Sequence, residues 1–209
     1  MEDSSRNDPK MPSFANTYFD RIICINLASR PDRWAECVSQ FKDFDLTAQR
    51  FDAVAWLPPL EGCYLSHWYA LRLASEFNRC LILEDDFEII HFDFGSRLRA
   101  LVQEVKSLPP YDVLYLGGNY RSPDFTQVSA GVRRTQGMAT TSSYAVTGNF
   151  ARRLLELPIC ADAIDVMIAS TAPTSVHYIA YPRLIRQRAG ISDLERGMVD
   201  YRKKMTDLL

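Results

Sequence analysis

Short, continuous apolar runs alternate along the chain with longer segments in which apolar residues recur at helical spacing. An apolar run of about four to eight residues is typical of a strand that is buried on both faces. Such strands are predicted at residues 21–27, 49–54, 80–83, 112–116, 140–147 and 175–181, and helices at residues 31–41, 61–77, 95–108 and 150–157. This alternation predicts an α/β fold with a mostly parallel central sheet that is flanked by helices, in which the later, more polar strands can run antiparallel.

Three segments fall outside this alternation. Residues 1–16 are rich in Asp, Ser, Asn and Pro, and we expect a disordered tail there before one domain over residues 17–209. Residues 120–138 are polar and weakly patterned, which is typical of a mobile lid when a connection is this long. Ser192 begins an S-x-x-E sequence that is typical of a helix N-terminus, so a C-terminal helix is predicted from there.

Composition and charge narrow the classes of function. The 209 residues carry a formal net charge of -2, so there is no broad basic field for duplex nucleic acid. No apolar run approaches the length of a membrane span, and the polar first residues do not resemble a secretory signal peptide. The five cysteines are scattered without C-x-x-C spacing, and Cys24 and Cys80 lie in strand-like runs. We therefore expect buried thiols, a reducing, cytoplasmic location and no cysteine-bound zinc.

Three consecutive carboxylates, Glu84, Asp85 and Asp86, end the apolar run at residues 80–83. Their mutual repulsion and desolvation disfavour folding, and ligands of open α/β sheets bind outside the carboxyl ends of strands. If the chain stays extended, Glu84 and Asp86 point to one side and Asp85 to the other. Two carboxylates on one side suit a hard divalent cation that keeps positions open for phosphate oxygens. The alternative is a solvated acidic turn without a function.

Other segments qualify this picture. The first strand, turn and helix form a βαβ opening, but they lack the G-x-G-x-x-G sequence, which argues against an NAD-dependent enzyme. The helix at residues 61–77 is apolar on most of its surface, so Ser66 and His67 are not simply solvated. His67 either contacts a ligand or hydrogen-bonds a backbone carbonyl and supports packing. Gly117 and Gly118 permit a positive φ or a close approach of the backbone to a ligand.

Several short motifs occur in a particular order. They are I-N-L-x-x-R-x-D-R from Ile25, G-C-x-x-S-H from Gly62, L-E-D-D from Leu83, then Asp112 to Leu116, Thr141-x-x-Tyr144, Ile164-Asp165, and Pro182 with Gln187 and Ser192-Asp193. Together they resemble glycosyltransferase family 25, which includes lipooligosaccharide β-galactosyltransferases and procollagen galactosyltransferases. The resemblance covers roughly residues 20–195, and it rests on the ordered set because no single motif is decisive.

The resemblance implies a GT-A type fold, with one Rossmann-like domain and a nucleotide-sugar site at the carboxyl edge of the sheet. It implies an inverting transfer of a hexose, often galactose, from a UDP-sugar to a hydroxyl of a glycan, lipooligosaccharide or glycoprotein acceptor. It also implies Mn²⁺ or Mg²⁺ as cofactor, with the E-D-D sequence in the place of the metal-binding D-x-D motif. The alternative is a catalytically silent sugar-nucleotide-binding domain of the same fold.

The resemblance implies a role for each residue that matches a position of the family's motifs. Asp86, together with Glu84, would hold the metal, and Asp85 would reach ribose or sugar hydroxyls. Asp165 is the candidate base for the acceptor hydroxyl, and its alternative is a helix-capping or salt-bridged carboxylate. His177 is a candidate third metal ligand, although a histidine inside a strand is more often structural.

The resemblance also assigns positions to donor binding. Arg30 or Arg33 could pair with phosphate oxygens. The alternative for each is a surface ion pair, and the pattern favours this alternative more for Arg33 than for Arg30. The candidate donor-binding residues are Asn26, Leu27, Arg30, Arg33, Gly62, Ser66 and Asp85.

Overall fold

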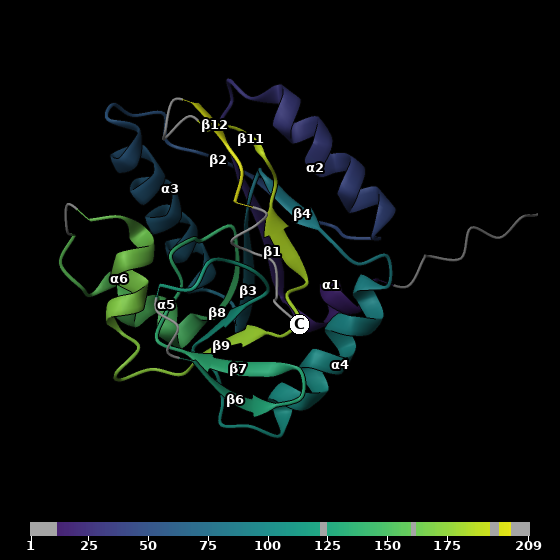
Figure 1. Ribbon diagram of the computed structural model, residues 1–209. Helices are drawn as coiled ribbons and strands as arrows, with labels where there is room; N and C mark the ends of the chain where they lie inside the picture. Colours follow the sequence, from purple (N-terminus) through teal and green to yellow (C-terminus); the bar gives the residue numbers. More distant parts are fainter. Residues whose placement is uncertain (1–11, 122–124, 160–161, 193–196, 202–209) are drawn as a thin grey trace, which may run out of the picture.

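An eight-stranded sheet in the order β2-β1-β3-β8-β5-β9-β7-β6 runs through the computed structural model, which describes residues 12–121, 125–159, 162–192 and 197–201 (Figure 1). Its strands are β1 (Arg21–Asn26), β2 (Gln49–Asp52), β3 (Arg79–Glu84), β5 (Val113–Tyr115), β6 (Phe125–Ser129), β7 (Val132–Thr135), β8 (Ser143–Thr147) and β9 (His177–Ala180). Two small sheets pair β4 (Phe87–Ile89) with β10 (Ile185–Gln187), and β11 (Gly190–Ser192) with β12 (Gly197–Val199).

Strands β2, β1, β3, β5 and β9 all point in one direction, because β8 lies antiparallel to both β3 and β5. The prediction of a mostly parallel sheet is confirmed, and of the later strands predicted from the sequence β8 runs antiparallel while β9 pairs parallel with β5. The continuous apolar runs form the strands because both faces of the sheet are covered, which leaves little room for polar alternation.

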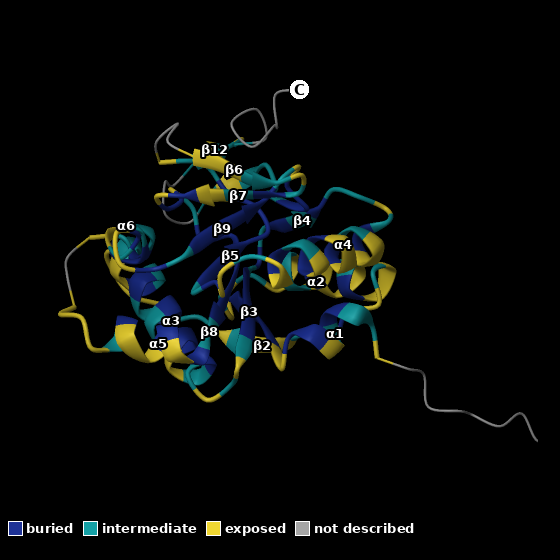
Figure 2. Ribbon diagram, turned by 90° about the horizontal axis from the view of Figure 1, so that it is seen from below, coloured by how far each residue is buried: buried dark blue, intermediate teal, exposed yellow. Residues whose placement is uncertain are grey.

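Helices cover both faces of the sheet. Helices α1 (Phe14–Tyr18), α2 (Pro31–Asp43) and α4 (Phe94–Lys106) pack on one face, and α3 (Pro59–Ala74), α5 (Gly148–Leu155) and α6 (Ile164–Ser170) pack on the other (Figure 1). Each face has its own core of buried residues. Figure 2 shows the central strands as the buried layer between the two groups of helices.

Helix α2 begins where the sequence predicts. Pro31 occupies its first turn, where a missing N–H costs nothing, and Asp32 lies at the positive end of the helix dipole. Cys37 and Phe41 are buried against the sheet, and Lys42 lies in the last turn. The helix therefore has a fixed start next to the end of β1.

The parallel pairing of β1 and β3 sets the position of the functional site. Ile25 of β1 lies opposite Glu84 of β3, so both strands end at the same edge of the sheet. The turn after β1 and the acidic turn after β3 are therefore neighbours, as expected for a ligand site in an α/β sheet.

Three expectations from the sequence are wrong. Residues 14–16 belong to α1 rather than to a tail, and the Asn16 amide donates a 2.6 Å hydrogen bond to the Thr47 carbonyl. The expected lid at residues 120–138 contains a hairpin of β6 and β7, in which β7 pairs with β9. The expected C-terminal helix is replaced by β11 and β12, while Asp193, Leu194 and Glu195 of its N-cap sequence lie outside the described residues.

Gly117 and Gly118 follow β5. A Cβ atom on Gly117 would lie 1.8 Å from the Ile185 carbonyl oxygen, and Gly118 has φ +137°. The pair therefore shows both a positive φ, at Gly118, and a close approach to another backbone segment, at Gly117. The close approach at Gly117 is made to the chain's own backbone at β10, and it holds β10 against the end of β5.

Candidate functional site

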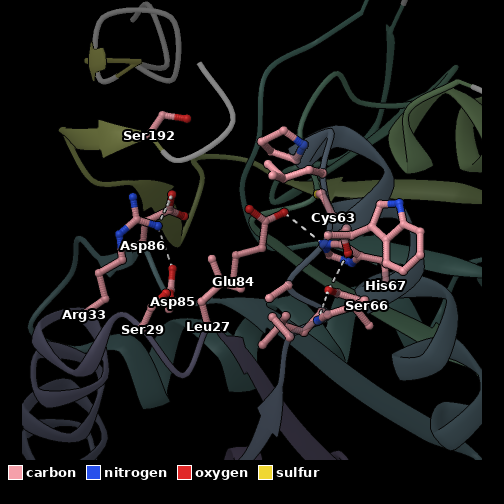
Figure 3. Close-up of a pocket in the computed structure, with 18 of the residues that line it drawn as sticks. Leu27, Ser29, Arg33, Cys63, Ser66, His67, Glu84, Asp85, Asp86 and Ser192 are labelled. Atoms are coloured by element: carbon pink, nitrogen blue, oxygen red, sulfur yellow. Dashed lines mark hydrogen bonds and ion pairs between the residues drawn. The ribbon is translucent and has the colours of Figure 1, made fainter. Parts of the chain in front are cut away.

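A cavity of about 770 Å³ opens at the carboxyl edge of the sheet (Figure 3). Its walls come from the turns after β1, β2 and β3 and from the first turns of α3, with contributions from β10 and β11. The lining residues are Ile25, Leu27, Ser29, Arg33, Ala53, Val54, Ala55, Trp56, Leu57, Pro59, Gly62, Cys63, Ser66, His67, Glu84, Asp85, Asp86, Gln187 and Ser192. A volume of this size suits a ligand as large as a nucleotide.

The three acids do not alternate as an extended chain would. Strand β3 ends at Glu84, and the backbone turns at Asp85 and Asp86 before β4 begins. The Glu84 carboxylate points toward His67, whereas Asp85 and Asp86 both lie beside Arg33 (Figure 3). The expectation that Glu84 and Asp86 share one side and Asp85 takes the other is therefore wrong, because it assumed that the strand continues.

Two side chains hold one oxygen of Glu84. The Thr141 hydroxyl donates a 2.7 Å hydrogen bond to Oε1, and His67 Nε2 lies 3.2 Å from the same atom. Burial alone would raise the pKa of Glu84, but hydrogen bonds from His67 and Thr141 and the charge of His67 lower it overall. Burial alone would lower the pKa of His67, yet Tyr144, Cys63 and Glu84 raise it well above its ordinary value. These directions describe a buried ion pair between His67 and Glu84.

Asp85 lines the cavity, but protein groups occupy both of its carboxylate oxygens. Its Oδ2 accepts a 2.7 Å hydrogen bond from the Asn26 amide, and its Oδ1 lies 2.7 Å from Nη1 of Arg33. Asn26 is itself buried, and its own oxygen accepts a hydrogen bond from Arg50. Asn26 does not line the cavity, so its predicted place in the nucleoside pocket is wrong; it fixes Asp85 from behind.

Asp86 has one oxygen without a partner. Its Oδ2 accepts a 3.1 Å hydrogen bond from Gln187 and lies 3.5 Å from Arg33 Nη1. Its Oδ1 is buried and has no hydrogen-bond partner among the described residues. Burial and the nearby Glu84 charge raise the pKa of Asp86 to about 7. A buried, unpaired carboxylate oxygen fits a hard cation, which would replace the missing partner.

The sequence favoured a surface ion pair for Arg33 more than for Arg30, and the structure shows the reverse. Arg30 pairs with its near neighbour Asp32 at 2.8 Å and does not line the cavity. Arg33 lines the cavity with its side chain 13% exposed, and its Nη2 donates a 2.6 Å hydrogen bond to the Ile191 carbonyl. The helical turn after Pro31 directs Arg33 inward, which the spacing of charges alone does not reveal.

Leu27, Gly62 and Ser66, which were candidates for donor binding, do line the cavity. The Ser66 hydroxyl donates to the Gly62 carbonyl at 2.6 Å and accepts from the Val54 amide at 2.8 Å. A Cβ atom on Gly62 would lie 2.7 Å from the Val54 carbonyl oxygen. Gly62 and Ser66 therefore hold the loop after β2 against α3, and that loop forms one wall of the cavity.

His177 does not belong to this site. His177 is the first residue of β9, and the register places it in one cross-strand row with Val113, Val146 and Cys80. Cys80 lies four residues before Glu84 on β3, so this row is well removed from the acidic turn. Nε2 of His177 lies 2.7 Å from the Ser175 hydroxyl, and burial lowers the pKa of His177 to about 4. The prediction of a metal ligand is wrong because the register places this residue toward the opposite edge of the sheet.

Asp165 lies in the first turn of α6, half-buried, and it is not among the residues that line the cavity. Its Oδ1 accepts a 2.8 Å hydrogen bond from the Val166 amide. Burial raises its pKa, Arg121 lowers it, and the Glu84 charge raises it further. Asp165 therefore does not form part of the cavity wall, and its role as a base stays a prediction.

Trp56, Cys63 and Gln187 are lining residues to which the sequence assigned no role in binding. The Trp56 side chain is 56% exposed, and its indole N–H donates a 2.9 Å hydrogen bond to Glu61. A large, exposed aromatic ring that is held by a hydrogen bond at a cavity rim is typical of a stacking surface. The loop after β2 has no periodic pattern, so a Trp within it gave no usable signal.

The charges of the cavity are unbalanced. Three carboxylates face one guanidinium and the imidazolium of His67 among its lining side chains. Within the described part of the chain, no group of three or more His, Cys, Asp and Glu side chains is arranged to hold a metal ion. Two carboxylates, from Glu84 and Asp86, each keep one oxygen that no described residue hydrogen-bonds. A cation there would complete its coordination from a ligand or from water.

Comparisons with known proteins point to one family. No family model matches the sequence. The chain is 25% identical to a glycosyltransferase 25 family member of Drosophila melanogaster, over 52% of this chain and 22% of that protein. It is 26% identical to the inactive glycosyltransferase 25 family member 3 of Homo sapiens, over 51% of this chain and 23% of that protein. Matching proteins of Bos taurus and Rattus norvegicus also carry the word inactive in their names.

The chain spans about a quarter of the length of the curated relatives it matches. Among solved structures, it is similar to UDP-glucose pyrophosphorylase complexed with UDP-glucose, with a TM-score of 0.45 and 10% sequence identity. That similarity covers 83% of this chain and 75% of the other. Within the described residues, no helix has the length and apolar character that a membrane crossing needs.

Proposed function

We propose, on the premise that the chain resembles glycosyltransferase family 25 in sequence, that it transfers a hexose from a UDP-sugar to a hydroxyl of a glycan or glycoconjugate. The family expectation for the sugar is galactose. Mn²⁺ or Mg²⁺ would be held by Asp86, with Glu84 as its companion. The observation that carries this proposal is the buried Oδ1 of Asp86, which no described residue hydrogen-bonds and which lies at a cavity of nucleotide size.

The charge balance supports a requirement for a cation. A nucleoside diphosphate is anionic, and the His67 imidazolium compensates Glu84 while Asp85 and Asp86 share the single guanidinium of Arg33, so the acidic turn would repel the diphosphate. A divalent cation between them removes that repulsion, and when bound it also stabilises the charge on the departing diphosphate. Burial and the charge of Glu84 raise the pKa of Asp86 even though Arg33 opposes the shift, and a bound cation would favour the ionised carboxylate.

The chain's own side chains divide the other tasks. Arg33 and Gln187 flank Asp86 and place N–H donors where phosphate oxygens would bind. Trp56 and Leu27 supply apolar surface for a base or sugar ring. An inverting transfer needs a base for the acceptor hydroxyl on the side opposite the leaving group. We assign this task to Asp165, because burial raises its pKa and makes its carboxylate the better proton acceptor.

A panel of UDP-sugars tests this function, with UDP release and product formation measured in the presence of Mn²⁺, of Mg²⁺ and of a chelator. We expect metal-dependent transfer from at least one donor, and a loss of about 100-fold or more in the Asp86→Asn variant. The matched control is Asp52→Asn, since Asp52 is exposed and lies outside the cavity. Full metal-dependent turnover by Asp86→Asn would remove Asp86 from the metal site.

A second candidate is a sugar-nucleotide-binding domain without activity, which is favoured by the names of three of the relatives. It predicts that UDP with Mn²⁺ raises the thermal midpoint, as any ligand of the folded state does, while no donor is consumed. Donor turnover that disappears in the Asp86→Asn variant would exclude it.

A further inference from the structure

We infer that His67 is a positioning residue for Glu84, which holds one carboxylate oxygen in place so that the other faces the cavity. This inference rests on the proposed function, because it concerns how the same site is kept in working geometry. The relation joins α3 to the end of β3, the strand that follows it in the chain.

The two ring nitrogens of His67 have different hydrogen-bond partners. His67 Nε2 lies 3.2 Å from Oε1 of Glu84, and Nδ1 lies 2.9 Å from the Tyr144 hydroxyl. Both ring nitrogens therefore have partners, and the Tyr144 bond fixes the angle of the ring. Thr141 adds a second bond to Oε1, so that oxygen is fully occupied while no described residue hydrogen-bonds Oε2. Figure 3 shows the Glu84 carboxylate between His67 and the Arg33 side of the cavity.

The environment keeps the imidazole rigid. His67 is 1% exposed, and its ring stacks on that of Tyr144 with 5.8 Å between the ring centroids. It lies on α3 among buried residues such as Ala70 and Leu71. A Glu side chain has three rotatable bonds, and holding it in one rotamer costs conformational entropy unless a fixed partner compensates. A buried histidine with hydrogen-bond partners at both ring nitrogens is such a partner. Residues that hydrogen-bond metal ligands orient those ligands in the same way at many metal sites.

Two substitutions of the same residue separate this role from simple packing. Glutamine places its side-chain nitrogen near the position of Nε2, and asparagine places its nitrogen near that of Nδ1. His67→Gln therefore keeps the contact with Glu84 and loses that with Tyr144, whereas His67→Asn does the reverse. We expect His67→Gln to keep kcat within about threefold, and His67→Asn to lose about 10- to 100-fold in kcat, with the KM for the UDP-sugar changing much less.

His91→Gln and His91→Asn form the matched control, because His91 bonds the Arg183 carbonyl and lies outside the cavity. That pair should show equal, wild-type kcat. Thermal unfolding of all four variants identifies any that fail to fold. An equal loss of kcat in the two His67 variants, or a higher kcat in His67→Asn than in His67→Gln, would overturn the positioning role.

A failure of the proposed function would be visible separately, as a wild-type protein that turns over no UDP-sugar under any metal condition. In that case crystal structures of the two variants decide the inference. We expect the Glu84 carboxylate to keep its place in His67→Gln and to move in His67→Asn. An unmoved carboxylate in His67→Asn would show that Thr141 and packing suffice, and the inference would be wrong.

Discussion

Arg33 Nη1 lies 2.7 Å from Asp85 Oδ1, and this ion pair joins the first turn of α2 to the turn that follows β3. The second oxygen of Asp85 accepts a hydrogen bond from Asn26 at the end of β1. Asp85 is thus fixed from two sides, and it in turn fixes the guanidinium of Arg33 beside Asp86. The middle acid of the three organises the site, while its two neighbours keep oxygens available.

The Arg33–Asp85 pair is expected to contribute to stability as well as to binding. Their side chains are 13% and 9% exposed, so Asp85→Asn leaves a nearly buried guanidinium with only the more distant Asp86 as a charged partner. We expect this change to lower the free energy of unfolding by roughly 2–4 kcal/mol. The control is Asp93→Asn, which breaks the exposed Arg97–Asp93 pair and should cost less than about 0.5 kcal/mol. Urea unfolding measures both, and equal losses would contradict the role of burial.

The layer architecture could be predicted from the sequence because its strands are continuous apolar runs and its helices are amphipathic. The strand predicted at residues 21–27 and the helix predicted from Pro31 are found as β1 and α2. The β6–β7 hairpin was missed because β6 is an edge strand whose side chains are largely exposed, so that neither face carries an apolar stripe. The turn-rich C-terminal part was missed because an S-x-x-E sequence is only a local signal.

The site was predicted less well, for a geometric reason. The sequence placed the acids at the carboxyl edge, but the roles of Asp85 and Arg33 depend on a turn at residues 85–86 and on the direction of one helical turn. Neither can be derived from periodicity. His177 was misplaced because a strand's sequence does not reveal its register, and the register moves it toward the other edge of the sheet.

Trp56 is expected to provide binding surface for the donor. Removal of the exposed indole by Trp56→Ala should weaken UDP binding about 10-fold, since stacking of an aromatic side chain on a base contributes roughly 1–3 kcal/mol. Trp56→Phe keeps an aromatic face and loses the hydrogen bond to Glu61, so we expect a smaller loss. Isothermal titration with UDP and Mn²⁺ provides the affinities. Unchanged affinity in Trp56→Ala would mean that the indole does not contact the nucleotide.

Asp165 is expected to act on the acceptor rather than on the donor. If it is the base, Asp165→Asn should lower kcat by about 100-fold or more and leave the KM for the UDP-sugar nearly constant. Asp162→Asn is the matched control, because Asp162 is exposed in the same segment. Steady-state transfer to a saturating acceptor measures the effect. Unchanged turnover in Asp165→Asn would leave Asp165 as a residue that hydrogen-bonds the first turn of α6.

His177 is expected to make stability depend on pH. Burial lowers its pKa to about 4, below the value of about 6.5 in an unfolded chain, so the unfolded state binds the proton more readily. Its stabilising contribution is complete above pH of about 6.5 and is lost as pH falls toward about 4, which amounts to about 2 kcal/mol between pH 7 and pH 5. His177→Gln keeps a nitrogen near Ser175 but does not titrate. Urea unfolding of both proteins at the two pH values isolates this contribution, because the opposite effect of His67 is common to both. The wild type should lose about 2 kcal/mol more than His177→Gln on acidification, and equal losses would show that His177 is protonated in the folded protein.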